Sequence, residues 1–499
     1  MRYLLSIDQS TSATKAVLFN QTAALIDSVS IEHRQYYPQP EWVEHDPVEI
    51  YNNTVKAVRQ VVANNAVNRE EIVALSITNQ RETVVVWDKQ SGQPVYNAIV
   101  WQCRRGAQIC KGLRDAGYED FIRERTGLVI DPYFSASGAQ WIMENVEGVN
   151  ELAEQHRLAI GTMDSWLIFK LTGGRNHLTD HTNASRTLLF NIVEKKWDAE
   201  ILSLFHIPGN ALPEVLPCNS LFGKTTLEGF FSSEIPITGV MGDSHAALFG
   251  QHCFETGMAK ATYGTGSSIM MNIGSRFRIA PQGVVTSIGY SLDHNTTYVF
   301  EGNIHCTGAT IKWLKDDLQL ISSSEESETI ATSVENNNGV YLVPAFAGLG
   351  APYWDNEANA LLCGMNRSAK KAHIVRAALE SIAYQIKDLL DVMSGMSGIE
   401  LTGLRVDGGP TRNEFLMQFQ SDMLNTPINR AEITETSALG VALMAGLSLR
   451  LWNNTDEIKS LRKNTKTYVP EMDEKERSHL YHGWIKAVKR TLLKEGGNN

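Results

Sequence analysis

Paired cysteines, long apolar runs and an excess of basic charge are all missing from this chain of 499 residues. None of its six cysteines forms a C-x-x-C pair, which argues against a zinc or dithiol redox site. No apolar stretch reaches the roughly 18 residues that a membrane span needs, and the start of the chain lacks a signal-peptide pattern. Lysine and arginine total 45 against 56 aspartate and glutamate residues, a formal net charge of −11. Because a nucleic-acid binder needs a basic face, that class of protein is disfavoured.

What remains is an ordinary globular composition, with 43% hydrophobic and 20% charged residues. The length indicates about two to four domains with a large buried core. We therefore expect a cytoplasmic protein whose partners are small molecules, without nucleic acid and without membrane insertion.

The order of the secondary-structure signals predicts an α/β fold. Asp46 can cap a helix, Pro47 suits its first position, and Glu49 would complete a capping box. Strand-like segments precede and follow this helix, at residues 3–8, 15–20, 24–33 and 72–78.

Residues 3–8 and 15–20, joined by a tight turn, indicate a β-hairpin at the start of the chain. A second hairpin of the same kind is predicted in the later half of the chain. Its turn is Gly264-Thr265-Gly266, with strands expected at 259–263 and 268–273. A further strand at 404–406 and a helix at 413–424 follow.

We interpret this repetition as two related domains, residues 1–250 and 251–499, with a cleft between them. The short polar run 322–328 is interpreted as a surface loop.

Residues 8–15 form the first cluster that could carry chemistry. A tight turn after the first strand exposes successive backbone N–H groups, which favour an anion. Thr11 and Ser12 add hydroxyl donors, and Lys15 adds a positive charge. Asp8, at the strand end, could hold Mg²⁺ through water. A capped β-turn without a ligand is the alternative interpretation.

Two glycine-containing turns and one carboxylate complete the set. The turn around Thr265 lets the backbone approach a phosphate, and Gly408-Gly409 lets a flat ligand lie against a helix start. Asp243 follows the apolar segment 237–241 and precedes a helix, where α/β enzymes place catalytic groups. Each feature also has a plain structural interpretation, as an ordinary turn or as a helix N-cap.

Together these clusters resemble the FGGY carbohydrate kinase family, most closely those members that act on glycerol. The resemblance covers nearly the whole chain and rests on segments 40–47 (PEWVEHDP), 78–83 (TNQRET), 98–105 (AIVWQCRR), 127–135 (GLVIDPYFS), 182–186 (TNASR), 344–355 (PAFAGLGAPYWD) and 360–380. It implies an α/β fold of two actin-like (ribonuclease-H-like) domains that close on their substrates, and a homodimer or homotetramer.

The resemblance also implies ATP-dependent phosphorylation of a small polyol, glycerol in the first place. Asp243 matches the catalytic base and, with Asp8, the Mg²⁺ site. The polyol-binding positions are Arg81, Glu82, Trp101, Tyr133, Asp243, Ser244 and Ser268. The ATP-binding positions are Thr11, Ser12, Lys15, Thr265, Gly308, Gly408, Gly409 and Asn413. Such a mixture of acceptors, donors and an aromatic wall suits a polyol, because each hydroxyl of a polyol both donates and accepts.

Four positions depart from the family's pattern. Ser244 stands where glutamine is usual and Ser268 where phenylalanine is usual, which predicts a roomier and more polar pocket. Ser10 replaces a glycine, which a negative φ would tolerate, and Gly138 replaces a lysine.

Two alternatives to a glycerol kinase activity stay open. The serines favour a kinase for a four- or five-carbon polyol or ketose. A non-catalytic ATP-gated binding module is the other alternative, because actin-like folds serve such roles too. The set of polyol-binding positions argues against that module.

Overall fold

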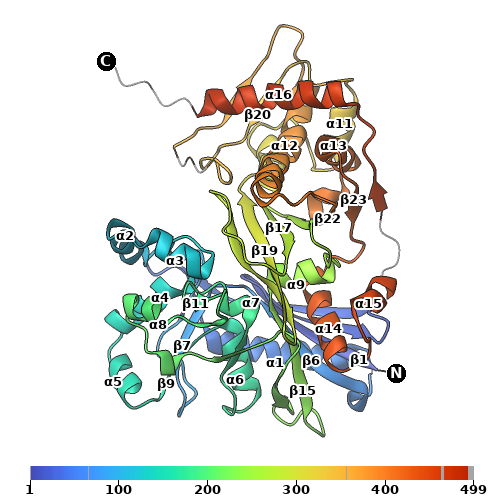
Figure 1. The fold of residues 1–499 in the computed structure, drawn as a ribbon. Coiled ribbons are helices and arrows are strands. Elements are labelled where there is room, and N and C mark those ends of the chain that lie inside the picture. Colours follow the sequence, from blue (N-terminus) through green and yellow to red (C-terminus); the bar gives the residue numbers. More distant parts are fainter. Residues whose placement is uncertain (1, 66, 354, 356, 462–465, 493–499) are drawn as a thin grey trace.

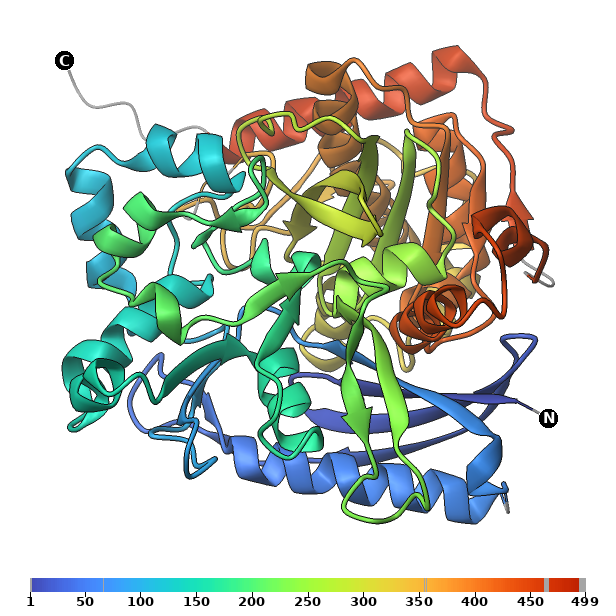
Figure 2. The same cartoon turned by 60° about the horizontal axis from the view of Figure 1, so that its bottom comes forward.

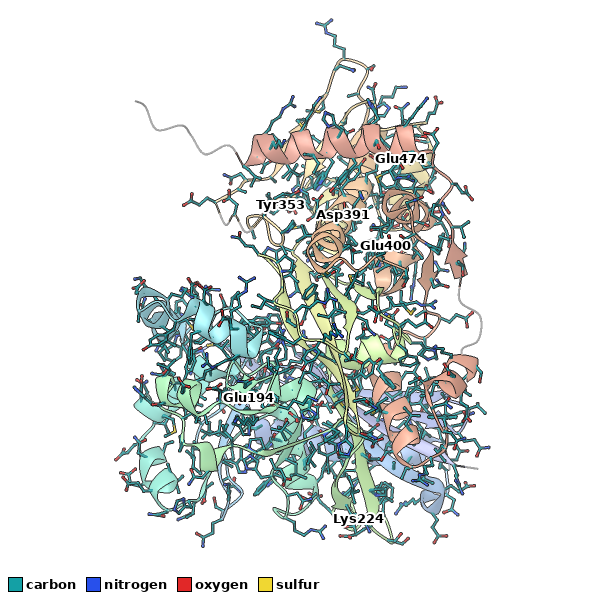
Figure 3. The ribbon with its side chains drawn as sticks, in the orientation of Figure 1. Glu194, Lys224, Tyr353, Asp391, Glu400 and Glu474 are labelled. Carbon is teal, nitrogen blue, oxygen red and sulfur yellow. The ribbon has the colours of Figure 1, made fainter. Side chains whose placement is uncertain are left out.

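The computed structural model describes residues 2–65, 67–353, 355, 357–461 and 466–492. The chain forms two parts, drawn one above the other in Figure 1. Among the labelled side chains of Figure 3, Glu194 and Lys224 lie in the lower part, while Asp391 and Glu474 lie in the upper part.

A six-stranded sheet in the order β14–β15–β6–β1–β2–β3 organises the lower part. Neighbours β1, β6 and β15 run parallel, and the remaining pairs are antiparallel. The strands are β1 Tyr3–Gln9, β2 Ala13–Asn20, β3 Leu25–Glu32, β6 Ile72–Asn79, β14 Leu221–Thr225 and β15 Ile235–Gly242.

Helices cover both faces of this sheet. Successive side chains of a strand point to opposite faces, so Leu5 packs in the core beneath α1 (Pro47–Asn64) and α6 (Met163–Leu171). Leu4 packs on the other face, against α9 (Asp243–Gly250) and α14 (Thr436–Ser448). In Figure 2, α1 runs along the bottom beneath the first strands.

The start of α1 confirms the predicted cap and corrects the predicted capping box. The Asp46 carboxylate accepts hydrogen bonds from the amides of Val48 and Glu49. The Glu49 carboxylate accepts instead from the amide of Arg34, 3.2 Å away, and so ties the preceding segment to the helix.

A five-stranded sheet, β4–β5–β8–β7–β9, extends the lower part and packs with its own apolar core. It carries the segments around Trp101 and Tyr133. Its elements are β4 Gln35–Tyr36, β5 Glu44–His45, β7 Val84–Asp88, β8 Ala98–Ile99, β9 Leu158–Thr162, α2 Ala107–Asp115, α3 Glu119–Thr126, α4 Ser135–Asn145, α5 Val149–Glu154 and α8 Ala199–Leu204.

The upper part contains a seven-stranded sheet in the order β18–β19–β17–β16–β22–β23–β24. Its strands are β16 Met258–Tyr263, β17 Ser267–Gly274, β18 Val285–Leu292, β19 Asn295–Ile304, β22 Gly403–Asp407, β23 Ile428–Arg430 and β24 Lys466–Tyr468. The helices of this part are α10 Gly308–Asp316, α11 Glu326–Thr332, α12 Lys371–Ser397, α13 Glu414–Leu424 and α16 Glu474–Thr491. Helix α15 (Thr455–Leu461) lies beside α14 in the lower part, where Ile458 packs in the same core as Leu4 (Figure 1).

Short elements link these sheets. They are α7 His181–Ala184, the strand pairs β10 Leu178–Asp180 with β13 Glu214–Leu216, β11 Phe190–Asn191 with β12 Lys196–Trp197, and β20 Tyr341–Val343 with β21 Leu361–Cys363, and the 3₁₀ turns η1 Arg69–Glu71, η2 Gly209–Ala211 and η3 Gly409–Arg412.

Both large sheets follow the same plan. The order β3–β2–β1–β6–β15 in the lower part corresponds to β19–β17–β16–β22–β23 in the upper part, with two antiparallel pairs followed by two parallel pairs in each. The predicted pair of related α/β folds is therefore confirmed.

Helix α14 crosses back from the second half of the chain onto the first sheet. A Cβ atom at Gly440 would lie 1.9 Å from the carbonyl oxygen of Ala246, so only glycine allows α14 to approach α9 this closely. The division of the chain at residue 250 stays a prediction. Trp354, within the family-like segment 344–355, lies outside the described residues.

No helix in the described parts of the chain combines the length and the apolar character that crossing a membrane requires.

Candidate active site

Three of the predicted site residues stand at one edge of the first sheet. Asp8 of β1 pairs in register with Thr78 of β6, and Met241 of β15 pairs with the same residue. The carboxyl ends of these parallel strands therefore lie side by side, and Asp8, Arg81 and Asp243 lie at the same edge of the sheet. In open α/β sheets this edge is where ligands bind.

Arg81 is the centre of a buried ion network. Its Nε lies 3.0 Å from Asp243 Oδ1. Its Nη1 donates to Glu301 Oε2 at 2.9 Å, and its Nη2 lies 2.8 Å from Glu301 Oε1 as an ion pair. Arg186 Nη1 lies 2.9 Å from the same carboxylate, and Arg186 Nε donates to Glu82 Oε1 at 2.6 Å. Glu301 belongs to β19, so the network joins the two parts of the molecule.

The network leaves one carboxylate open to solvent. The side chains of Arg81, Glu82 and Glu301 are at most 6% exposed, whereas that of Asp243 is 38% exposed. Burial opposes ionisation of Glu301, but Arg186 and Arg81 hold the pKa of Glu301 well below its usual range. Asp243 can thus meet a ligand while Arg81 fixes its orientation.

Glu82 adopts a left-handed backbone conformation, with a φ of 64°. This region is unfavourable for a residue with a side chain, and strained residues of this kind cluster at functional sites. Burial raises the pKa of Glu82, against the opposing effect of Arg81 and Arg186.

Trp101 and Tyr133 form an aromatic wall beside the network. Their rings pack edge to face with centroids 5.5 Å apart. Trp101 Nε1 donates to Thr11 Oγ1 at 3.0 Å, which connects the predicted polyol-binding positions to the first predicted phosphate turn. Both side chains are partly exposed.

Ser244 and Ser268 come from a helix and a strand far apart in the sequence, and their hydroxyl groups face each other. Ser244 follows Asp243 in α9, Ser268 lies on β17, and their hydroxyl oxygens are 3.4 Å apart. The structure thus brings together the two positions that depart from the family's pattern.

The other two departures fit their surroundings. Ser10 is absent from the residues with positive φ, as its replacement of a glycine requires. A Cβ on Gly138 would lie 3.2 Å from a methyl group of Val84 and 3.3 Å from one of Ile99, so a side chain at this position would require these neighbours to shift.

The turn at 10–13 is closed by a hydrogen bond from the Ser10 amide to the Ala13 carbonyl, at 2.9 Å. Lys15 Nζ lies 2.9 Å from a carboxylate oxygen of Glu435, at the start of α14. Burial raises the pKa of Asp8 to about 7; Lys15 opposes this shift, and Asp243 and Glu435 add to it.

The carboxylates of Asp8 and Asp243 could contribute to a Mg²⁺ site. No group of three or more histidine, cysteine or carboxylate side chains placed to hold a metal occurs among the described residues. Mg²⁺ is commonly held by one or two carboxylates, with waters and substrate phosphates as its other ligands. Asp8 and Asp243 are compatible with that mode.

A cavity of about 620 Å³ opens on the upper sheet. Of the predicted ATP-binding residues it is lined by Thr265, Gly308, Gly409 and Asn413. Thr265 lies in the β16–β17 turn, and its carbonyl accepts from the amides of Thr307 and Ala309 at the start of α10.

Gly408 adjoins this cavity at the end of β22. Its φ of 98° is open to glycine, and a Cβ there would lie 2.0 Å from the Tyr263 carbonyl oxygen. A side chain at this position would therefore push β16 and β22 apart.

The interpretation of residues 322–328 as a plain surface loop is wrong. Helix α11 begins at Glu326, and Ser324, Glu325, Ser327 and Glu328 line the cavity. Asn413, the N-cap of α13, donates from Nδ2 to Ser327 Oγ at 3.2 Å. The sequence did not reveal this contact, because the two residues are 86 positions apart and a polar run is typical of a surface loop as well.

Sequence reasoning missed Arg186, Glu301 and Glu435 as members of the site. Arg186 ends a segment that carried the family resemblance, and Glu301 directly follows the apolar residues 298–300 in the largely buried strand β19. A charge in such a strand is a usable signal, because glutamate is almost never fully buried without a partner.

Comparison with known sequences places the chain in a family. The pattern of the FGGY family of carbohydrate kinases, N-terminal domain, matches residues 3–250, and that of the C-terminal domain matches residues 259–449. The chain belongs to the FGGY family of carbohydrate kinases. It is therefore an ATP-dependent kinase, as the sequence predicted.

The relatives are close and of similar length. A protein of Thermotoga maritima named glycerol kinase 1 is 52% identical over 490 residues, which is 98% of this chain and 99% of that protein. A glycerol kinase of Caldanaerobacter subterraneus is 49% identical, again with 98% of this chain and 99% of that protein covered. The crystal structure of Plasmodium falciparum glycerol kinase with ADP superposes with a TM-score of 0.95 at 37% identity, covering 99% of both chains.

Proposed function

We propose that this protein transfers the γ-phosphoryl group of ATP to glycerol and so produces glycerol 3-phosphate. The observation that carries the proposal is the Asp243 carboxylate, partly exposed and held 3.0 Å from Arg81 at the edge where the predicted polyol and phosphate positions meet. Relatives named glycerol kinase, about half identical over nearly the whole chain, support glycerol as the acceptor.

Arg81, Glu82, Trp101 and Tyr133 are proposed to bind the polyol. Arg81 donates, Glu82 accepts and the Tyr133 hydroxyl can do either, so each hydroxyl of the polyol can find a partner. Trp101 supplies an apolar wall for the carbon chain.

Asp243 is proposed as the general base. Its carboxylate takes the proton of the terminal hydroxyl while that oxygen bonds to the γ-phosphorus, and the bond to the bridging oxygen of ATP breaks to release ADP. Arg81 holds the carboxylate in position and remains protonated throughout.

ATP is proposed to lie across both sheets. Thr11, Ser12, Lys15 and Thr265 would contact the phosphates, and Gly308, Gly408, Gly409 and Asn413 would border the rest of the nucleotide. Asp8 and Asp243 would hold Mg²⁺, which neutralises phosphate charge when bound. Lys15 would then exchange Glu435 for a phosphate oxygen.

A four- or five-carbon polyol or ketose is the second candidate substrate. The facing hydroxyls of Ser244 and Ser268 favour it, because they leave polar space where larger side chains are usual in the family. A panel of glycerol, erythritol, xylitol and xylulose, with ADP release as the readout, separates the candidates. Absence of turnover on every member would contradict both.

A cytoplasmic location and a homodimer or homotetramer, as the sequence predicts, remain proposals. Size-exclusion chromatography with light scattering would determine the oligomeric state.

A further inference from the structure

A buried lysine with no assigned role lies directly behind the candidate polyol site. Lys260, on β16, is fully buried. Its Nζ donates to Thr262 Oγ1 at 3.3 Å and to Ser268 Oγ at 3.4 Å. Within the described residues, no carboxylate lies within ion-pair distance of this ammonium group. A buried lysine is normally paired with a carboxylate, so hydroxyl partners alone are unusual.

Strand register places Lys260 on the face of the upper sheet that looks toward Arg81. Lys260 pairs with Met270, which pairs with Glu301, and Thr262 pairs with Ser268. Residues directly opposite in antiparallel strands share a face, as do residues two apart along a strand. Glu301 on this face contacts Arg81, and Ser268 contacts Ser244.

The charges around Lys260 come from several elements. Burial lowers its pKa, whereas Asp407 of β22, Glu301 of β19 and Asp243 of α9 favour the charged form. Arg81 opposes them. The ammonium group thus lies among three carboxylates without being neutralised by direct contact with any one of them.

The direction of the hydrogen bonds then follows from chemistry. An ammonium group has three donors and no acceptor, so Ser268 Oγ must accept from Lys260. The hydroxyl hydrogen of Ser268 remains available for donation. Its neighbour on the open side is Ser244 Oγ, 3.4 Å away beside Asp243.

We propose that Lys260 is a positioning residue of the phosphoryl-transfer site, which fixes the Ser268 hydroxyl as a hydrogen-bond donor toward the polyol. Lys260 acts through Ser268 and does not itself touch the substrate. The inference deepens the proposed function and rests on it. The proposed partner of the Ser268 hydroxyl is therefore a hydroxyl oxygen of the polyol, which accepts the hydrogen bond.

A double-mutant cycle tests the link. Lys260→Met, Ser268→Ala and the double variant are compared with the wild type for KM of glycerol, KM of ATP and kcat. We expect Lys260→Met to raise the glycerol KM roughly three- to tenfold, as expected for one net hydrogen bond, with the ATP KM within about twofold. In the Ser268→Ala background the same change should have no further effect.

Thr262→Val is the matched control, because it removes the other hydroxyl partner of Lys260 and leaves Ser268 in place. The glycerol KM of this variant should equal that of the wild type. A raised value would overturn the assignment to Ser268, as would independent, multiplying effects of Lys260→Met and Ser268→Ala. Should Lys260→Met not fold, Lys260→Gln gives the same cycle with a neutral polar side chain. A wild type inactive on glycerol would instead refute the proposed function.

Discussion

Arg81 Nε and Asp243 Oδ1 lie 3.0 Å apart, and the same guanidinium group makes a bidentate contact with Glu301 of the opposite sheet. A single planar side chain therefore fixes the proposed base relative to both parts of the molecule. Arginine suits this role, because its five donors form a rigid fork that stays protonated.

Replacing Asp243 by asparagine should abolish phosphoryl transfer and leave ATP binding largely intact. The amide keeps the shape of the side chain but cannot take the proton, and loss of a general base reduces the rate by roughly 10²–10⁴-fold. ADP release measures turnover, and calorimetry measures ATP affinity. Asp293→Asn, the same change in the exposed β18–β19 hairpin, is the control. More than about a tenth of wild-type turnover in Asp243→Asn would refute the role.

Glu301→Gln should destabilise the protein and weaken polyol binding together. It leaves two buried guanidinium groups with less compensation, which typically lowers the free energy of unfolding by about 3–5 kcal/mol. Glu194→Gln, labelled in Figure 3, removes an exposed contact with Lys196 and should change stability by about 1 kcal/mol or less. Urea unfolding and the glycerol KM are the measurements. Equal stability losses in the two variants would argue against the network.

Magnesium dependence should vary with pH through Asp8. Because the pKa of Asp8 is raised to about 7, its carboxyl group is mostly protonated at lower pH, and Mg²⁺ must displace that proton. The Mg²⁺ concentration for half-maximal activity should fall as the pH rises from about 6 to about 8. Asp8→Asn should lose this dependence along with most of the activity. A wild-type requirement for Mg²⁺ that is constant over this range would exclude Asp8 as a ligand.

Thr265→Val should weaken ATP far more than the polyol. The Thr265 side chain is exposed at the mouth of the cavity on the upper sheet, and valine keeps its shape without the hydroxyl. We expect the ATP KM to rise roughly tenfold, the effect of about 1.4 kcal/mol. Thr265→Ser retains the hydroxyl and should behave like the wild type. A rise in the glycerol KM alone would contradict the assignment of this cavity to ATP and would place the polyol there instead.

The sequence predicts elements from local signals and misses contacts made over long distances. The cap at Asp46, the two hairpins and the strand before Asp243 follow from turn residues and apolar runs, which act within a few positions. Glu301 and Arg81 are 220 positions apart, so no local pattern connects them.

The same limit explains Ser327 and Lys260. The run around Ser327 is polar because it borders a cavity, and composition does not distinguish that from solvent exposure. Lys260 lies in a strand whose partners become known only through register. Ser244 and Ser268, in contrast, could be found by their departure from the family's pattern.

Those two serines are proposed to line the acceptor end of the polyol site. Their hydroxyls are 3.4 Å apart, and Ser268 also accepts from Lys260. Space and hydrogen-bonding capacity at this point favour an acceptor with an additional hydroxyl-bearing carbon.

Ser244→Gln combined with Ser268→Phe should therefore shift preference toward glycerol over a four-carbon polyol. Phenylalanine adds an apolar wall against a short carbon chain, worth about 1–3 kcal/mol, and glutamine adds an amide, worth roughly 1 kcal/mol. A longer polyol would clash with the filled space. The ratio of kcat/KM values, glycerol over erythritol, should rise roughly ten- to a hundredfold.

The single variants are needed beside the double one, because the two side chains touch and their effects need not add. Ser268→Phe also removes one of the two hydroxyl partners of Lys260, so thermal unfolding is measured to separate a loss of folded protein from a change in preference. Ser220→Gln, at a partly exposed residue just before β14, controls for a large amide added elsewhere. An unchanged ratio in a stably folded double variant would show that Ser244 and Ser268 do not line the polyol site, and the case for a longer substrate would then disappear.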